Sequence, residues 1–127
     1  MEIFELTAHE LVDLIKKRDL SSEEVTNAIF ERIEQVDDEV HAYVTLNKED
    51  ALARARMIDS RIREGEELGQ LAGIPVGLKD NICTKGLRTT CSSRMLENFV
   101  PPYNATVVEK IYDAGAMVTG KLNMDEF

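Results

Sequence analysis

Two helix-start signals follow each other closely near the beginning of the chain and determine the character of its first half. Thr7 and Glu10 have the spacing of a capping box, and Ser21 and Glu24 repeat that spacing after a short gap. Apolar residues flank each cap at the spacing of a hydrophobic staple and continue at helical spacing behind it. Two starts so close together predict a helix hairpin rather than one long helix.

A third helix is predicted after a short connection. Residues 40–46 alternate weakly between apolar and polar side chains, which fits a short strand or an extended link. Asn47 is a plausible cap for the helix that follows, and Gly65 stands where a C-terminal glycine is expected. The charged residues of this helix are mixed in sign and are interpreted as a solvated face: Arg54, Arg56, Asp59, Arg61, Arg63 and Glu64.

The pattern changes after Gly69. Residues 73–78 are apolar and punctuated by glycine and proline, and Pro75 cannot donate to a sheet ladder, so we predict a strand at a sheet edge. A long loop over residues 81–102 separates it from the next regular element. These features are typical of an α/β domain rather than a helical bundle.

The last part of the chain adds a helix and a strand. Asn104 can cap the helix, residues 116–119 fit the strand, and Asn123 with Glu126 resembles the start of one more helix. The order predicts an α/β fold with a largely parallel sheet. We expect residues 1–127 to be the N-terminal part of a single domain, with a helical layer over 1–69 and the start of the α/β core over 70–127.

Charge and hydropathy restrict the possible functions. The net charge of -9 argues against broad, sequence-independent binding to a nucleic-acid backbone, although an acidic subunit could still join a complex whose partner holds the RNA. No apolar run is long enough to span a bilayer, and the acidic N-terminus does not have the pattern of a secretory signal. We therefore expect a cytoplasmic protein without a membrane role.

The two cysteines, Cys83 and Cys91, do not have CxxC spacing, and His9 and His41 lie far upstream of them. A zinc site needs more ligands than this. We interpret the cysteines as free thiols in a reducing compartment.

Lys79 is the strongest candidate for a catalytic residue, because it directly follows the apolar segment 73–78. A lysine held there would lose water, which disfavours the ammonium, and a neutral amine can take a proton from a serine. The alternative interpretation is an exposed lysine at a strand end, paired with Asp80.

Two serines are weaker candidates for a nucleophile. Ser92 and Ser93 lack a GxSxG setting and have no nearby histidine. Residues 89–93 are more simply interpreted as a hydroxyl-rich loop that makes turn contacts. Gly115 and Gly120 do not form a dinucleotide or phosphate-binding motif.

Two stretches of the second half resemble signature blocks of a known family. Residues 73–86, GIPVGLKDNICTKG, are similar to the first block of the amidase-signature family. Residues 118–127, VTGKLNMDEF, resemble the block that leads towards that family's nucleophile region. Within the family, residues 43–55 and the ending NMDEF are most similar to the A subunits of aspartyl/glutamyl-tRNA amidotransferases. The similarity covers the whole chain.

This resemblance implies a Ser–cis-Ser–Lys amidase in which Lys79 matches the family's lysine. The lysine deprotonates the bridging serine, which relays the proton from the nucleophile that attacks the carboxamide. Both serines lie downstream of Phe127 in the family, so we expect this N-terminal fragment to be inactive alone. We also expect a truncated mixed sheet in which four apolar residues are left exposed: Val76, Leu78, Met117 and Val118.

The resemblance also implies partners. In these amidotransferases the amide is that of glutamine, and the A subunit works with B and C subunits in a heterotrimer. The B subunit uses the ammonia to amidate Glu or Asp misacylated on tRNA(Gln) or tRNA(Asn). ATP and Mg are therefore expected on the B subunit, and tRNA is expected to be contacted mainly through that partner. No cofactor is expected in this chain. Two alternatives stay open: a fragment of another amidase-signature hydrolase that acts on a different small amide, and a non-catalytic truncated interaction module.

Overall fold

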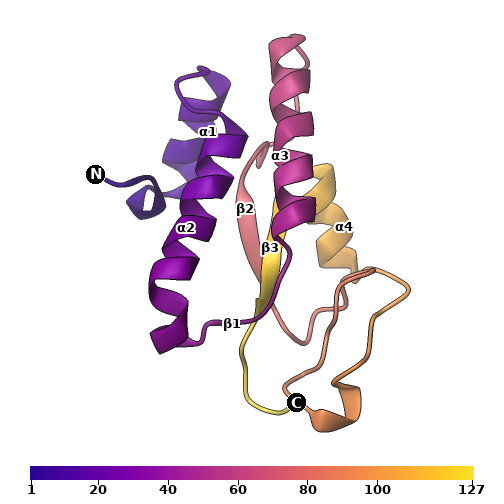
Figure 1. Ribbon diagram of the computed structural model, residues 1–127. Coiled ribbons are helices and arrows are strands. Elements are labelled where there is room, and N and C mark those ends of the chain that lie inside the picture. The colour runs from indigo at the N-terminus through magenta and orange to yellow at the C-terminus, as the bar shows by residue number, and fades with distance from the viewer.

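Helices α1 and α2 begin the chain and lie to the left of a small sheet in Figure 1, and α3 follows strand β1. The structure, a computed structural model, describes residues 1–127. The elements in chain order are a short 3-10 helix Ile3–Glu5, α1 Ala8–Lys16, α2 Ser22–Val40, β1 Tyr43–Leu46, α3 Lys48–Arg63, β2 Pro75–Lys79, a 3-10 turn Arg94–Leu96, α4 Thr106–Asp113 and β3 Met117–Leu122.

The predicted starts of α1 and α2 are confirmed, although the Glu24 side chain does not complete a capping box at α2. The Thr7 hydroxyl accepts a hydrogen bond from the backbone of Glu10, and the Glu10 side chain accepts one from the backbone of Thr7, which completes the capping box of α1. The Ser21 hydroxyl caps α2 by accepting from the Glu24 backbone at 3.0 Å. Local signals therefore place the starts of both helices.

The sheet has the strand order β1-β3-β2, so the last strand lies in the middle. β2 runs parallel to β3, whereas β1 runs antiparallel to it. The sheet is therefore mixed, as the family resemblance implied, and not largely parallel. The edge position predicted for the strand that contains Pro75 is confirmed, since β2 pairs only with β3.

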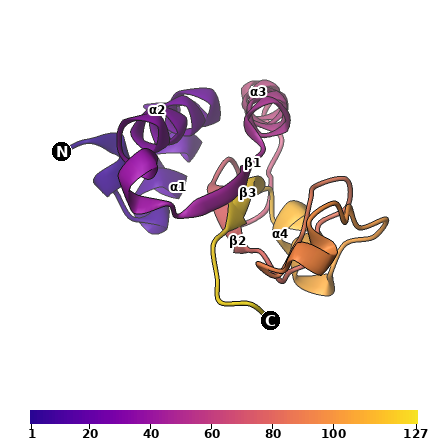
Figure 2. The same cartoon turned by 60° about the horizontal axis from the view of Figure 1, so that its bottom comes forward.

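The sheet is covered on both faces (Figure 2). In that view α2 and α3 lie on one side of the strands, and α4 lies with the long loop on the other. The core on the α2–α3 side consists of Phe30, Ala51, Ala55 and Met117. The core on the α4 side consists of Leu78, Val108 and Val118. A third cluster joins α1 and α2 to the residue before β2: Leu11, Ile15, Val25 and Ile74.

The expected exposure of four apolar residues is wrong. Leu78 is only 4% exposed, Met117 and Val118 are fully buried, and Val76 is half-buried. The reason is that β3 is paired along both edges, while helices pack on both of its faces within this chain. A central strand with both faces covered leaves little apolar surface for other segments to cover.

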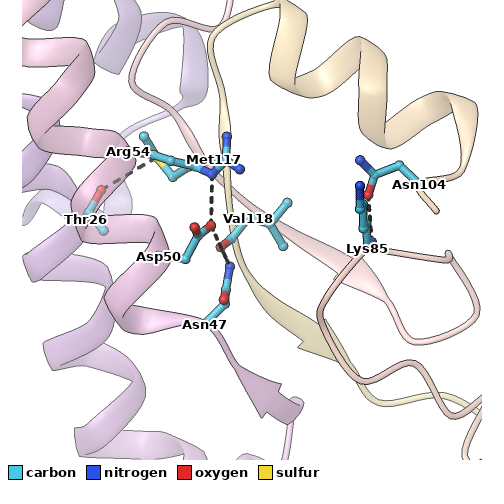
Figure 3. Close-up of polar contacts among 8 residues, drawn as sticks. All are labelled: Thr26, Asn47, Asp50, Arg54, Lys85, Asn104, Met117 and Val118. Atoms are coloured by element: carbon cyan, nitrogen blue, oxygen red, sulfur yellow. Dashed lines mark hydrogen bonds and ion pairs between the residues drawn. The ribbon is translucent and has the colours of Figure 1, made fainter. Parts of the chain in front are cut away.

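Two asparagines predicted as helix caps make other contacts, and one predicted helix does not form. Asn47 stands at the start of α3 but makes no capping bond; its side chain donates to the Val118 carbonyl at 3.0 Å and so ties α3 to β3 (Figure 3). Asn104 accepts from the backbone of Lys85 at 2.7 Å, and α4 starts two residues later. Residues 123–127 form no helix.

None of the helices combines the length and the apolar character that crossing a bilayer requires.

Candidate functional site

Lys79 is the last residue of β2, at the carboxyl end of the parallel strand pair. Its side chain is exposed, so the expected loss of water is not found in this chain. The alternative pairing with Asp80 is not found either, because Lys79 takes part in none of the chain's five ion pairs. The structure therefore presents a free amine at a fixed strand end.

Asp80, the next residue, is fully buried and faces the loop instead. Its Oδ2 accepts hydrogen bonds from the backbone and the hydroxyl of Thr90. Its carbonyl accepts from the Cys91 backbone at 2.9 Å, and its own N–H donates to Leu122 of β3 at 3.0 Å. Three of its polar groups therefore hold β2, β3 and the loop together immediately after Lys79.

Lys121 is a buried charged residue that the sequence reasoning did not single out. It lies in β3, is fully buried, and its Nζ donates to the Ile82 carbonyl, to Thr84 Oγ1 at 3.1 Å and to Thr89 Oγ1 at 2.9 Å. Burial lowers the pKa of Lys121 below its ordinary value, and the Asp80 carboxylate opposes that shift. The one available signal was a lysine placed inside an otherwise apolar strand segment.

The two lysines lie on opposite faces of the sheet. In the register of β2 against β3, Lys79 stands beside Leu122 and Leu78 stands beside Lys121. Successive side chains of a strand alternate between faces, so Leu78 and Lys121 share the α4 side and Lys79 points to the other. The candidate base is therefore separated from the buried ammonium by the sheet itself.

The hydroxyl-rich segment 89–93 makes turn contacts, as predicted. The Ser93 hydroxyl accepts from the Met95 backbone at 3.3 Å and caps the short turn that follows. Ser92 lies near Asn123, with 3.5 Å between its Oγ and the amide oxygen. Cys91 and Ser92 both have positive φ values, 53° and 54°, which give the loop a sharp reversal. Neither serine is hydrogen-bonded to Lys79.

The cysteines are free and partly exposed, as expected. The Cys83 sulfur lies 3.5 Å from the hydroxyl of Tyr103, and Cys91 lies in the loop beside Asp80. No group of three or more His, Cys, Asp or Glu side chains is arranged to hold a metal ion.

A surface cavity of about 220 Å³ lies away from Lys79. It is formed between α3 and the segments around Gly69 and Gly115, and it includes Tyr112. Gly115 precedes β3, whereas Lys79 ends the parallel strand β2, so the two features lie at opposite ends of the sheet. Lys79 is thus an exposed, unpaired lysine at the end of β2, at the opposite end of the sheet from this cavity.

Comparison with known proteins shows which family of sequences the chain matches. The sequence profile of the family Amidase matches residues 24–127. The chain is 59% identical over 127 residues to the A subunit of glutamyl-tRNA(Gln) amidotransferase from Moorella thermoacetica, covering 100% of this chain and 26% of that protein. The chain therefore spans about a quarter of the length of this relative.

Solved structures share the fold. The native peptide amidase of Stenotrophomonas maltophilia superposes with a TM-score of 0.90 at 36% identity, over 96% of this chain and 25% of that one. The A subunit of glutamyl-tRNA(Gln) amidotransferase from Thermotoga maritima gives a TM-score of 0.75 at 34% identity, over 99% of this chain and 24% of that one. The fold is thus common to these enzymes, and the identities of 36% and 34% do not distinguish between the two structures.

Proposed function

The chain belongs to the Amidase family, and from that premise we propose that it forms the N-terminal part of the glutamine-hydrolysing subunit of a glutamyl-tRNA(Gln) amidotransferase. The observation that carries the proposal is the 59% identity to the Moorella thermoacetica subunit over the whole chain. An identity this high over a complete segment supports a shared role more strongly than a shared fold does.

In this proposal Lys79 is the base. Its amine takes the proton of a bridging serine, which in turn receives the proton of the serine nucleophile; both serines come from the remainder of the protein. The nucleophile attacks the glutamine carboxamide, ammonia leaves, and water releases glutamate from the acyl-enzyme. Lys79 stands at a strand end, exposed and without an ion pair, so its side chain is open to the serines that the remainder supplies. In this proposal the loss of water that favours the neutral amine also comes from that remainder.

The ammonia then serves a partner. We propose that B and C subunits complete the complex, that B binds ATP and Mg, and that B contacts the tRNA, where ammonia amidates the misacylated Glu or Asp. The acidic balance of this chain, with a net charge of -9, supports leaving the nucleic acid to a partner.

A second candidate is a hydrolase for another small amide. It is favoured by the higher TM-score to the peptide amidase, 0.90 against 0.75 for the amidotransferase subunit. The substrate pocket distinguishes these functions, so the assay must offer both kinds of amide.

The test is a chimera in which this chain replaces the matching segment of the Moorella thermoacetica subunit, produced together with that protein's partners. We expect glutamine hydrolysis in the chimera, and a loss of about 100-fold or more in kcat with Lys79→Ala, which is typical for removal of a general base. Lys79→Arg should not rescue, because the guanidinium stays charged. The matched control is Lys85→Ala, which removes another exposed lysine from the neighbouring loop.

Two results would contradict the proposal. Near-normal turnover of Lys79→Arg would remove the role of the lysine as a base. A folded chimera that hydrolyses peptide amides but not glutamine would favour the second candidate.

A further inference from the structure

The ammonium of Lys121 is fully satisfied by three oxygens. The two threonine hydroxyls that it contacts donate their own hydrogen bonds to backbone carbonyls. Thr84 donates to the Ile82 carbonyl at 3.1 Å, and Thr89 donates to the Leu87 carbonyl at 3.1 Å. Both hydroxyls must therefore accept from the lysine, as the Ile82 carbonyl also must. Three acceptors require three N–H donors, so Lys121 is a fixed buried cation.

The carboxylate of Asp80 is satisfied on one oxygen only. Oδ2 accepts from the backbone of Thr90 at 3.2 Å and from the Thr90 hydroxyl, while Oδ1 is buried without a hydrogen-bond partner. No ion pair or hydrogen bond joins this carboxylate to Lys121, although the carboxylate charge opposes the lowering of the Lys121 pKa by burial. Burying a carboxylate with few hydrogen-bond donors raises the free energy of the folded chain. The hydrogen bond from the Thr90 hydroxyl is therefore a main contact that stabilises the Asp80 side chain.

These contacts close the loop behind the end of β2. Lys121 holds residues 82–89 against β3, and Asp80 holds Thr90 and Cys91 against β2. We name this group, Asp80, Thr84, Thr89, Thr90 and Lys121, the loop clasp. Each residue of the clasp is buried, and all of them lie in β3 or in the loop that leaves Lys79.

We propose that the loop clasp positions the amine of Lys79, with Asp80 and Lys121 as its two charged positioning residues. This inference rests on the proposed function of Lys79 as the base. Lys79 makes no side-chain hydrogen bond or ion pair of its own, so its direction depends on the backbone between the buried Leu78 and the buried Asp80. A base must lie within hydrogen-bond reach of the proton that it takes, and a misplacement of about 1 Å can cost about 100-fold in rate.

A merely structural clasp would behave differently. It would lower the stability of the fold, but the molecules that stay folded would hydrolyse glutamine at the normal kcat. A positioning clasp lowers kcat in folded protein and leaves KM nearly unchanged. The reason is that the Lys79 amine takes part in proton transfer and not in glutamine binding.

The test uses the same full-length chimera with Thr90→Val, which removes the hydroxyl at nearly constant volume, and Thr90→Ser, which restores it. Thr84→Val probes the Lys121 side of the clasp, and Thr106→Val, an exposed threonine of α4, is the matched control. We expect kcat for glutamine to fall about 10- to 100-fold in both valine variants of the clasp, with KM within about 2-fold, recovery in Thr90→Ser and no change in Thr106→Val. Circular dichroism and thermal melting of each protein establish the folded fraction.

The outcomes separate this inference from the proposed function. If Lys79→Ala abolishes hydrolysis while folded Thr90→Val and Thr84→Val keep the normal kcat, the loop clasp is structural and the inference is overturned. If Thr90→Val does not fold, Thr84→Val alone decides by the same criterion. If Lys79→Ala keeps the normal kcat, the proposed function fails, and the inference fails with it.

Discussion

The backbone N–H of Ser22 donates a hydrogen bond of 2.7 Å to Oδ1 of Asp59, a residue of α3. The neighbouring N–H of Glu23 donates to Oδ2 of the same carboxylate at 3.0 Å. Both N–H groups belong to the first turn of α2, which has no partners for them within the helix. Asp59 was expected on a solvated face, yet it is only 8% exposed and joins the two helices at the positive end of the α2 dipole.

Asp59→Ala should therefore destabilise the chain by about 1–3 kcal/mol, because it leaves one buried and one partly buried N–H group without acceptors. Urea unfolding of the 127-residue chain followed by circular dichroism measures the change in the free energy of unfolding. Asp113→Ala, at the exposed C-terminal end of α4, is the control and should cost nothing measurable. Equal unfolding midpoints for the two variants would show that the Asp59 contacts do not stabilise α2.

Gly120 should not tolerate a methyl group. A Cβ there would lie 2.3 Å from the backbone oxygen of Thr45, so Gly120→Ala must push β1 away from β3. Gly65→Ala is the comparison that separates backbone strain from steric overlap. Gly65 has a positive φ of 84° but open space around it, so a methyl group there causes strain without overlap. We expect about 1 kcal/mol for Gly65→Ala from backbone strain, and a larger loss for Gly120→Ala, measured by thermal unfolding.

The stability of the chain should fall above pH 10 through Tyr43. Burial raises the pKa of Tyr43 above its ordinary value of 10.0, although its hydrogen bond to Thr119 opposes the shift. The unfolded chain then loses the proton first, so the stabilisation is complete below about pH 10 and is lost as the pH rises through the folded value. Tyr43→Phe should remove this part of the alkaline loss, as urea unfolding from about pH 9 to about pH 11 would measure. An identical alkaline slope in both proteins would contradict the assignment.

Strand β3 should be the slowest part of the sheet to exchange amide hydrogens. It is paired on both edges and covered on both faces, whereas residues 123–127 form no regular structure. We expect protection around Val118 comparable to that of α2 and little protection after Leu122, measured by hydrogen exchange of the isolated chain. Fast exchange at Val118 would mean that this strand needs further segments to stay ordered.

The isolated chain should not hydrolyse glutamine. It offers the Lys79 amine, but neither Ser92 nor Ser93 is hydrogen-bonded to that amine, and a base without a nucleophile cannot form an acyl-enzyme. The measurement is ammonia release by purified chain beside the full-length chimera. Turnover that disappears with Lys79→Ala would refute the expectation.

Short-range signals in the sequence were sufficient for the starts of α1 and α2 and for the strand end at Lys79, but not for the caps predicted at Asn47, Asn104 and Asn123. The caps at Thr7 and Ser21 bond to residues three positions away, so a pattern of four residues contains both partners. Pro75 restricted its strand to an edge for an equally local reason, because it lacks an N–H. The position of Lys79 followed from the apolar segment before it, and its chemical role stays a prediction.

The tertiary structure alone decided which polar groups are buried and what they hold. Asp59 bonds to Ser22 across 37 positions, and Lys121 bonds to Thr89 across 32, so no local pattern contains both partners. The burial of Val118 depends on α4, which packs against it, and on β1 and β2, which pair with β3 along its two edges. A charged residue in the sequence favours solvent unless a distant segment supplies its partners, and only the folded chain brings those segments together.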